Sequence, residues 1–256
     1  MLSTLMLAIA LGCSSAASQE KSPDLDVVAR LIFEQTNRFR TGEGRSELRP
    51  NSQLAATASD LAEFMAKTDK YGHNANGSEP PQRAKKHGYE YCLVAENIAY
   101  FARTTGFTSD ELAGALVEGW KKSPPHRKNL LDPDALEVGN AVAHSTKSGK
   151  YYAVQVLGRP SSAAIEFEIV NQSSAEVKYQ IGDESMSMPP RLVRTHRQCR
   201  SDKLKFVSSD ATSGSQVFRP GLGDRFVITR NQDKLEVRRE PARGDQPNGA
   251  EVPSRN

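Results

Sequence analysis

Apolar residues recur at spacings of three, four and seven between residues 25 and 40, as they do on one face of a helix. The same spacing predicts helices over residues 51–67 and 109–121. The third helix opens with the capping-box sequence Thr-Ser-Asp-Glu at 108–111 and is stopped by the proline pair at 124–125. The first half of the chain is therefore predicted to be largely helical.

Beyond residue 133 the pattern changes to period two, which predicts paired strands over residues 136–144 and 150–158. Helices followed by a strand hairpin indicate a layered α+β domain. After residue 160 no helical pattern is found, and short alternating runs separated by turn residues predict a small all-β module, either a sandwich or a barrel. These runs cover residues 165–170, 177–181, 203–207, 225–229 and 235–238.

The chain is thus predicted to divide into four segments. They are a signal and tether over residues 1–22, the α+β domain over 23–160, the all-β domain over 161–240, and a disordered tail over 241–256 rich in Pro, Gly and charge.

The first residues are typical of an export signal. No charged residue occurs before Cys13, and the apolar run over 5–11 is too short to span a bilayer. Ala10-Leu11-Gly12-Cys13 resembles a bacterial lipobox, which predicts lipidation of Cys13 and a membrane anchor through its acyl chain. The sequence Ser-Ser-Ala at 14–16 fits ordinary secretion instead. The predicted location is therefore the outer or cell-surface membrane, or the medium.

The charge balance, hydrophobic share and cysteine count of the chain argue against several classes of protein. The chain has 256 residues, with 34 Lys and Arg against 31 Asp and Glu, and this net charge of +3 argues against a nucleic-acid binder. A hydrophobic share of 37% argues against an integral membrane protein. Three cysteines are too few for a disulfide framework. If Cys13 is acylated, Cys92 and Cys199 are left either to pair or to stay as buried thiols.

The common catalytic signatures are absent from the sequence, including Gly-x-Ser-x-Gly, His-Glu-x-x-His and the phosphate-binding P-loop. The informative residues form five ordered motifs. They are His73 after the second helix, Pro80 to Tyr89, Ala95-Glu96-Asn97-Ile98-Ala99, Trp120 to Leu131 with its Ser-Pro-Pro-His-Arg-Lys-Asn core, and Tyr151-Tyr152-Ala153-Val154-Gln155-Val156.

In these motifs residues 26–158 resemble the CAP superfamily of cysteine-rich secretory, antigen 5 and pathogenesis-related proteins, and specifically its bacterial SCP-like extracellular branch. The resemblance implies an α-β-α sandwich with a central antiparallel sheet and a solvent-filled cleft. In eukaryotic members this cleft holds two His and two Glu that can bind a divalent cation. His73 and Glu96 match the first of each, whereas Ser123 and Tyr152 stand at the other two positions.

A histidine near a carboxylate forms either an acid–base pair or two metal ligands, and zinc takes three or four protein donors. His126 is a candidate for the third donor. Its alternative role is that of a helix-terminus histidine that, with Arg127 and Asn129, locks the turn to the core. Glu96 has the alternative role of holding a loop through backbone N–H groups. The residues predicted to line the cleft are His73, Glu96, Ser123, His126 and Tyr152, with His73 and Glu96 as candidates for catalysis and for weak zinc binding.

In the β module, Arg191 to Lys205 carries six basic residues against one acidic residue. Such a stretch fits a cell-surface protein, an anionic glycan, a lipid headgroup or phosphate, or is simply a solvated strand face.

Three functions are compatible with these features. The favoured hypothesis is an exported CAP-domain protein of the bacterial envelope that binds a hydrophobic ligand or a cell-surface partner through the cleft. The second is a metal-assisted hydrolase of peptide or cell-wall bonds, with His73 as base and Glu96 orienting it. The third is a non-catalytic envelope scaffold. Since no nucleophile is evident, binding is favoured over catalysis.

Overall fold

A computed structural model describes residues 22–207, 215–231 and 234–240. Within them, no helix is long and apolar enough to cross a membrane. Cys13 and the predicted C-terminal tail lie outside the described residues.

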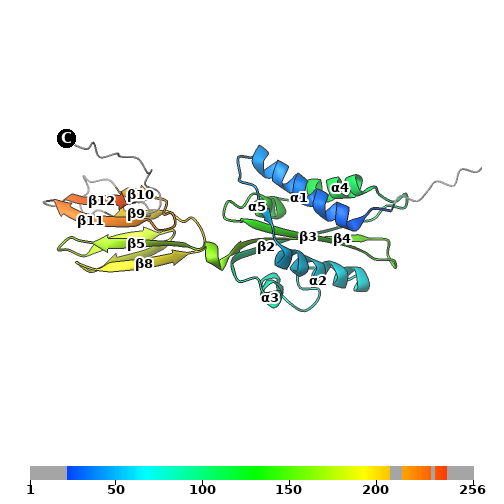
Figure 1. The fold of residues 1–256 in the computed structure, drawn as a ribbon, viewed down its shortest axis with the longest axis horizontal. Helices are drawn as coiled ribbons and strands as arrows, with labels where there is room; N and C mark the ends of the chain where they lie inside the picture. The colour runs from blue at the N-terminus through cyan, green and yellow to red at the C-terminus, as the bar shows by residue number, and fades with distance from the viewer. Residues whose placement is uncertain (1–21, 208–214, 232–233, 241–256) are drawn as a thin grey trace, which may run out of the picture.

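The N-terminal domain has three layers, with helices on both faces of a four-stranded sheet (Figure 1). Because both faces of the sheet are covered, the predicted α-β-α sandwich is confirmed. The sheet has the order β1-β3-β4-β2, with β3, β4 and β2 antiparallel and the two-residue β1 parallel to β3. Its strands are β1 (Arg49–Pro50), β2 (Tyr91–Phe101), β3 (Glu137–His144) and β4 (Tyr151–Pro160). The helices are α1 (Leu25–Gly42), α2 (Ser52–Thr68), α3 (Pro80–Lys86), α4 (Ser109–Lys122) and α5 (Pro124–Leu130).

Strand β4 runs through the centre of this domain and is buried on both faces. Tyr151 and Ala153 pack against α1 and α4, whereas Val154 and Val156 pack against α2. Because successive strand residues point to opposite faces, one strand supplies the core of both helical layers. The alternating pattern predicted the strand but not that its second face would also be covered.

The three predicted long helices are present, and the capping box at Thr108 is formed. Helix α3 and strand β2 were not predicted as elements, although both carry motifs noted in the sequence. Strand β2 lacks a simple alternation because it has a register irregularity between Tyr91 and Leu93 and is partly covered on both sides.

The β module, β5 to β12, is a sandwich of two four-stranded sheets. One sheet has the order β10-β9-β6-β7 and the other β12-β11-β5-β8, and β11 pairs with β5 in parallel. Aromatic and aliphatic side chains from both sheets, including Phe167, Tyr179, Phe206 and Phe226, form one core between them. The strands are β5 (Ile165–Asn171), β6 (Val177–Ile181), β7 (Glu184–Met188), β8 (Val193–Gln198), β9 (Leu204–Val207), β10 (Gln216–Phe218), β11 (Arg225–Asn231) and β12 (Lys234–Glu240).

The two domains are joined by more than the chain between β4 and β5. A disulfide links Cys92 on β2 to Cys199, the residue after β8. Arg200 forms ion pairs with Asp132 at 3.0 Å and with Asp134 at 3.5 Å. The backbone N–H of Ser201 donates to Asp134 Oδ1 at 3.0 Å. The segment after β8 is therefore held against the N-terminal domain by covalent and ionic contacts.

Candidate functional site

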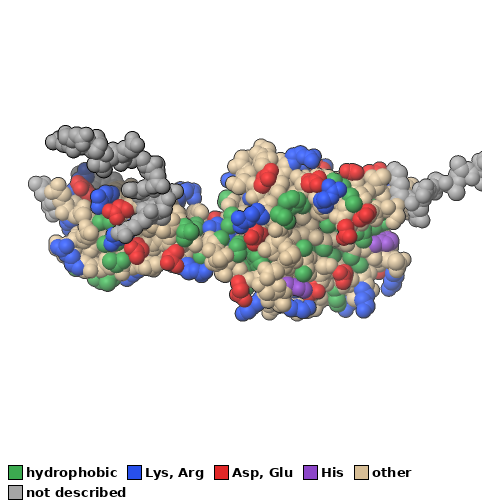
Figure 2. Space-filling model, in the orientation of Figure 1, with side chains coloured by type: hydrophobic (Ala, Val, Ile, Leu, Met, Phe, Trp, Pro, Cys, Tyr) green, Lys and Arg blue, Asp and Glu red, His purple; other side chains and the backbone are tan. Residues whose placement is uncertain are grey.

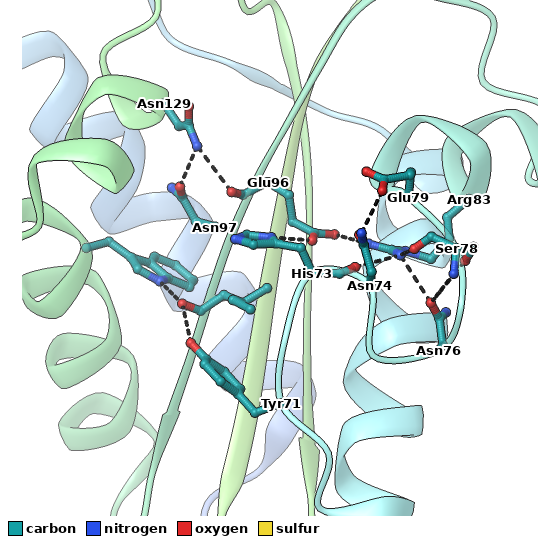
Figure 3. Close-up of polar contacts among 12 residues, drawn as sticks. Tyr71, His73, Asn74, Asn76, Ser78, Glu79, Arg83, Glu96, Asn97 and Asn129 are labelled. Carbon is teal, nitrogen blue, oxygen red and sulfur yellow. Dashed lines mark hydrogen bonds and ion pairs between the residues drawn. The ribbon is translucent and has the colours of Figure 1, made fainter.

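The candidate site lies beside β2, which is an edge strand of the N-terminal sheet. Edge strands leave backbone groups without a strand partner, and these groups need other partners when they are buried. Glu96 comes from β2, Arg83 from α3, and His73 from the connection between α2 and α3. Figure 3 shows the three side chains meeting from these separate elements.

The centre of the site is the carboxylate of Glu96, whose side chain is only 1% exposed. His73 Nδ1 lies 2.8 Å from Glu96 Oε1, and Arg83 Nη2 lies 2.6 Å from Glu96 Oε2. Arg83 is equally buried, whereas the side chain of His73 is 48% exposed. Both oxygens of the Glu96 carboxylate thus have partners. The imidazole of His73 is held by Glu96 at Nδ1 and is otherwise open to solvent.

Arg83 also fixes the loop that carries His73. Its Nη1 donates to the carbonyl of His73 at 2.9 Å, to Asn76 Oδ1 at 3.2 Å and to the carbonyl of Ser78 (Figure 3). Arg83 lies within the motif Pro80 to Tyr89, but nothing in the sequence assigns it a role. Its importance follows from its burial, which residue type and spacing do not reveal.

Side chains from α4, α5 and the connection between α2 and α3 satisfy the free edge of β2. The carbonyl of Ile98 accepts hydrogen bonds from Tyr71 Oη at 3.1 Å and from Trp120 Nε1 at 3.2 Å. Asn129 Nδ2 donates to the carbonyl of Glu96 at 3.1 Å and to Asn97 Oδ1 at 2.9 Å. The motif residues Trp120 and Asn129 therefore hold α4 and α5 against the strand that carries Glu96.

Behind Glu96, a buried amide network crosses the sheet. Asn97 Nδ2 donates to Gln155 Oε1 at 3.1 Å, and Gln155 Nε2 donates to Thr36 Oγ1 at 3.0 Å and to Asn140 Oδ1 at 3.1 Å. Buried amides with complete partners make a structure rigid, so this network fixes the position of β2 relative to α1 and β3.

The remaining residues predicted for the cleft lie around this centre. His126 is half-buried on α5, and its carbonyl accepts from Asn97 Nδ2 at 3.4 Å. Ser123 ends α4 and begins α5, with no capping hydrogen bond from its side chain to α5. Tyr152 is fully buried, and its hydroxyl donates to Asp69 Oδ1 at 3.1 Å. Tyr152 is thus a core residue with one polar contact.

The site does not fit the divalent cation that the resemblance implies. Both oxygens of Glu96 and one nitrogen of His73 are already engaged, and the guanidinium of Arg83 places a positive charge against the carboxylate. Among the described residues no group of three or more His, Cys, Asp or Glu could hold a metal ion. His126 supplies no third donor in this arrangement.

A tyrosine cluster, Tyr71, Tyr100 and Tyr152, lies toward the C-terminal end of β2. The rings of Tyr71 and Tyr100 are 5.0 Å apart, edge to face, and those of Tyr100 and Tyr152 are 5.7 Å apart. Tyr71 and Tyr100 are 47% and 44% exposed, and Lys150 Nζ lies 4.9 Å from the centre of the Tyr100 ring. Tyr100 was not among the residues predicted to line the cleft, because its exposure depends on the fold and not on its residue type. Exposed aromatic surface and a half-exposed imidazole, both held against β2, can bind an amphipathic ligand.

The basic stretch of the β module does not present all its charges to solvent. Arg194 donates to the hydroxyl of Tyr179 and to the carbonyl of Ser187. Arg197 donates to the carbonyl of Ser161, and Arg200 pairs with Asp132 and Asp134. Three of its four arginines are therefore engaged within the protein. On the face of the molecule shown in Figure 2, basic and acidic side chains are interspersed over both domains.

The ring of His126 is expected to titrate below an ordinary histidine. Burial lowers its pKa, and the nearby His73 lowers the pKa further. We expect His73→Gln to raise the pKa of His126, because the substitution removes the neighbouring imidazole whose electrostatic effect lowers it. His144→Gln, on β3, should leave it unchanged. Proton NMR titration of the imidazole resonances measures both effects, and an unchanged His126 titration in His73→Gln would contradict this assignment.

The lowered pKa of His126 also determines how this residue makes the stability of the protein depend on pH. The unfolded chain binds more protons than the folded chain between the lowered pKa of His126 and the ordinary value near 6.5. This group therefore lowers the stability of the protein as the pH falls through that window.

The layers and motifs define the class of this domain. The family model "Cysteine-rich secretory protein family", the CAP family, matches residues 33–157. The N-terminal domain of the chain therefore belongs to the CAP superfamily.

Individual relatives cover the same part of the chain. The Uncharacterized protein YkwD of Bacillus subtilis (strain 168) is 26% identical over 131 residues, which are 51% of this chain and 47% of the relative. The chain thus spans about half the length of this curated relative. Among solved structures, an outer surface protein from Borrelia burgdorferi has a TM-score of 0.46 and 19% identity, over 52% of this chain and 92% of that one. An extracellular protein containing a SCP domain from Bacillus anthracis str. Ames has a TM-score of 0.44 and 25% identity, over 53% and 41%.

Proposed function

We propose that this chain is an exported protein of the bacterial envelope whose CAP domain binds an amphipathic ligand without catalysing a reaction on it. The ligand has an apolar body that covers the exposed rings of Tyr71 and Tyr100 and a polar group that hydrogen-bonds the free side of His73. Export is supported by the apolar run over residues 5–11 and by the Cys92–Cys199 disulfide, since disulfides persist in oxidising compartments.

The observation that carries the proposal is the pairing of the Glu96 carboxylate with both His73 and Arg83. A covalent mechanism would need a side-chain nucleophile beside His73, and among the described residues the ring of His73 hydrogen-bonds only to Glu96. Glu96 in turn is neutralised by Arg83. The hydrogen bond between Glu96 and His73 therefore holds the imidazole in one orientation. A fixed imidazole suits recognition of a polar group on a ligand.

The experiment uses dodecanoate as the amphipathic probe, titrated into the purified full-length protein and followed by calorimetry. His73→Gln and Tyr100→Ala are each expected to weaken binding about tenfold or more, which corresponds to about 1.4 kcal/mol. Tyr91→Ala is the matched control, because Tyr91 is an exposed tyrosine at the other end of β2. Its binding should equal that of the wild type.

Native mass spectrometry of the same proteins provides the second measurement. A lipid-sized adduct on the wild type that is reduced in Tyr100→Ala supports the proposal. A metal-sized adduct lost in His73→Gln would favour the hydrolase instead, and bare protein that also binds no dodecanoate would favour the scaffold.

A further inference from the structure

The sandwich of the β module has an open side between the edge strands β7 and β8, one from each sheet. The inward-facing residues of β8 are polar: Arg194, His196 and Gln198. In a β-sandwich these positions normally carry apolar side chains. Polar groups placed there must find partners inside the protein or in a ligand.

Two of the three have partners inside the protein. Arg194 Nη1 donates to Tyr179 Oη at 2.9 Å and to the carbonyl of Ser187 on β7 at 3.0 Å. His196 Nε2 lies 2.9 Å from Tyr179 Oη, and its ring stacks on Phe167. These contacts close one end of the gap between β7 and β8.

Gln198, the third, has no such partner. Both its amide nitrogen and its amide oxygen are buried, and neither forms a hydrogen bond. A buried carboxamide without partners is destabilising, and a group that supplied both a donor and an acceptor would remove that cost.

A cavity of about 440 Å³ adjoins Gln198 at the open end of the gap. Its volume falls within the range of roughly 300–1,000 Å³ that is typical of ligand sites. The apolar part of the cavity wall is formed by Ile181 and Met186. The remainder is formed by the turn between β6 and β7 and by the segment after β8. The other lining residues are Gly182, Asp183, Glu184, His196, Arg197 and Asp202.

The charges around this cavity are mainly negative. Asp183, Glu184 and Asp202 line it, and within the described part of the chain none of these carboxylates forms an ion pair. Arg197 is the one Lys or Arg in the lining, and its Nη2 donates to the carbonyl of Ser161. The cavity therefore favours a positively charged group.

We propose that this cavity, the Gln198 site, binds a short basic peptide segment. A peptide group has one N–H donor and one C=O acceptor, which match the carboxamide oxygen and nitrogen of Gln198. A neighbouring lysine or arginine side chain of the ligand meets the carboxylates, and its aliphatic stem packs on Ile181 and Met186. This site is separate from the His73 site and does not depend on the function proposed for it.

The test is a titration of the purified full-length protein with acetyl-Ala-Lys-Ala-amide, followed by NMR of the side-chain amide of Gln198 and by calorimetry. Saturable binding of the lysine peptide is expected, with at least tenfold weaker binding of acetyl-Ala-Glu-Ala-amide. Gln198→Leu should weaken binding of the lysine peptide tenfold or more. Because this variant removes the unpartnered amide, its ligand-free form should also melt at a higher temperature than the wild type.

Gln180→Leu is the matched control, since Gln180 lies on β6 and donates to Ser185 Oγ, away from the Gln198 cavity. It should bind the lysine peptide as the wild type does. Asp202→Asn, at an exposed position, is a second variant that should weaken binding of the lysine peptide without affecting folding. Absence of binding to the wild type would overturn the proposal, as would equal binding by Gln198→Leu or equal binding of the glutamate peptide. Saturable binding of calcium chloride at Gln198 without binding of the peptide would reassign the site to a cation.

Discussion

Replacing Arg83 with methionine is expected to destabilise the CAP domain by about 3–5 kcal/mol. The substitution keeps much of the side-chain length but removes the charge 2.6 Å from Glu96 Oε2. The carboxylate of Glu96 would then remain buried with only His73 as a partner, and removing one member of a buried ion pair leaves an uncompensated charge. Loss of the bonds from Nη1 would also release the loop that carries His73.

Urea unfolding measured by circular dichroism gives the free energy of unfolding for each variant. Lys86→Met is the control, because Lys86 lies on the same helix and pairs with Asp60 while remaining well exposed. It should cost about 1 kcal/mol or less, as exposed ion pairs do. Adding Glu96→Gln to Arg83→Met should restore part of the stability. Equal losses for Arg83→Met and Lys86→Met would show that the buried pair is not what holds this site together.

Replacing Gly139 with alanine is expected to destabilise the same domain by about 3 kcal/mol or more, at the upper end of the range for overpacked cores. A Cβ at this position on β3 would lie 2.0 Å from the backbone nitrogen of Ala55 on α2. No side-chain rotation relieves an overlap with backbone, so helix α2 would have to move away from the sheet.

Gly114→Ala is the control for Gly139→Ala, because it adds the same methyl group where no other part of the protein lies close. Gly114 lies inside α4, and a Cβ there meets no atom within 4 Å apart from its chain neighbours and the backbone of its own helix. Gly114→Ala should therefore stabilise the protein by about 0.5–1 kcal/mol, since alanine loses less conformational freedom than glycine in a helix. Thermal melting of both variants measures the two opposite shifts. A Gly139→Ala protein that melts with or above the wild type would contradict the close contact between α2 and β3.

These two predictions address different parts of the CAP domain. Gly139 sets how closely α2 approaches the sheet, and Arg83 sets where the loop after α2 is held. Both determine the position of His73 relative to the exposed tyrosines. The proposed ligand site therefore depends on packing contacts that lie outside the site itself.

The sequence determined the class of each domain and the order of most elements. Helical spacing located α1, α2 and α4, and period-two patterns located β3, β4 and five strands of the β module, because apolar residues recur regularly along these elements. The motifs identified the CAP domain and singled out His73 and Glu96. Strand β7 was missed because only Met188 in it is buried, β8 because its inward-facing positions are polar, and β10 because it has only three residues.

Only the tertiary structure decided what the candidate residues do. Burial of Arg83 against Glu96 turned a predicted pair of metal ligands into an ion pair with an oriented imidazole. Pairing of Cys92 with Cys199, which the sequence left open, joins the two domains. That the amide of Gln198 is buried without a partner follows only from the packing of the two sheets. The physical reason is common to all three: periodicity reports which face of an element is buried, whereas the charge state and partners of a side chain depend on residues far away in the chain.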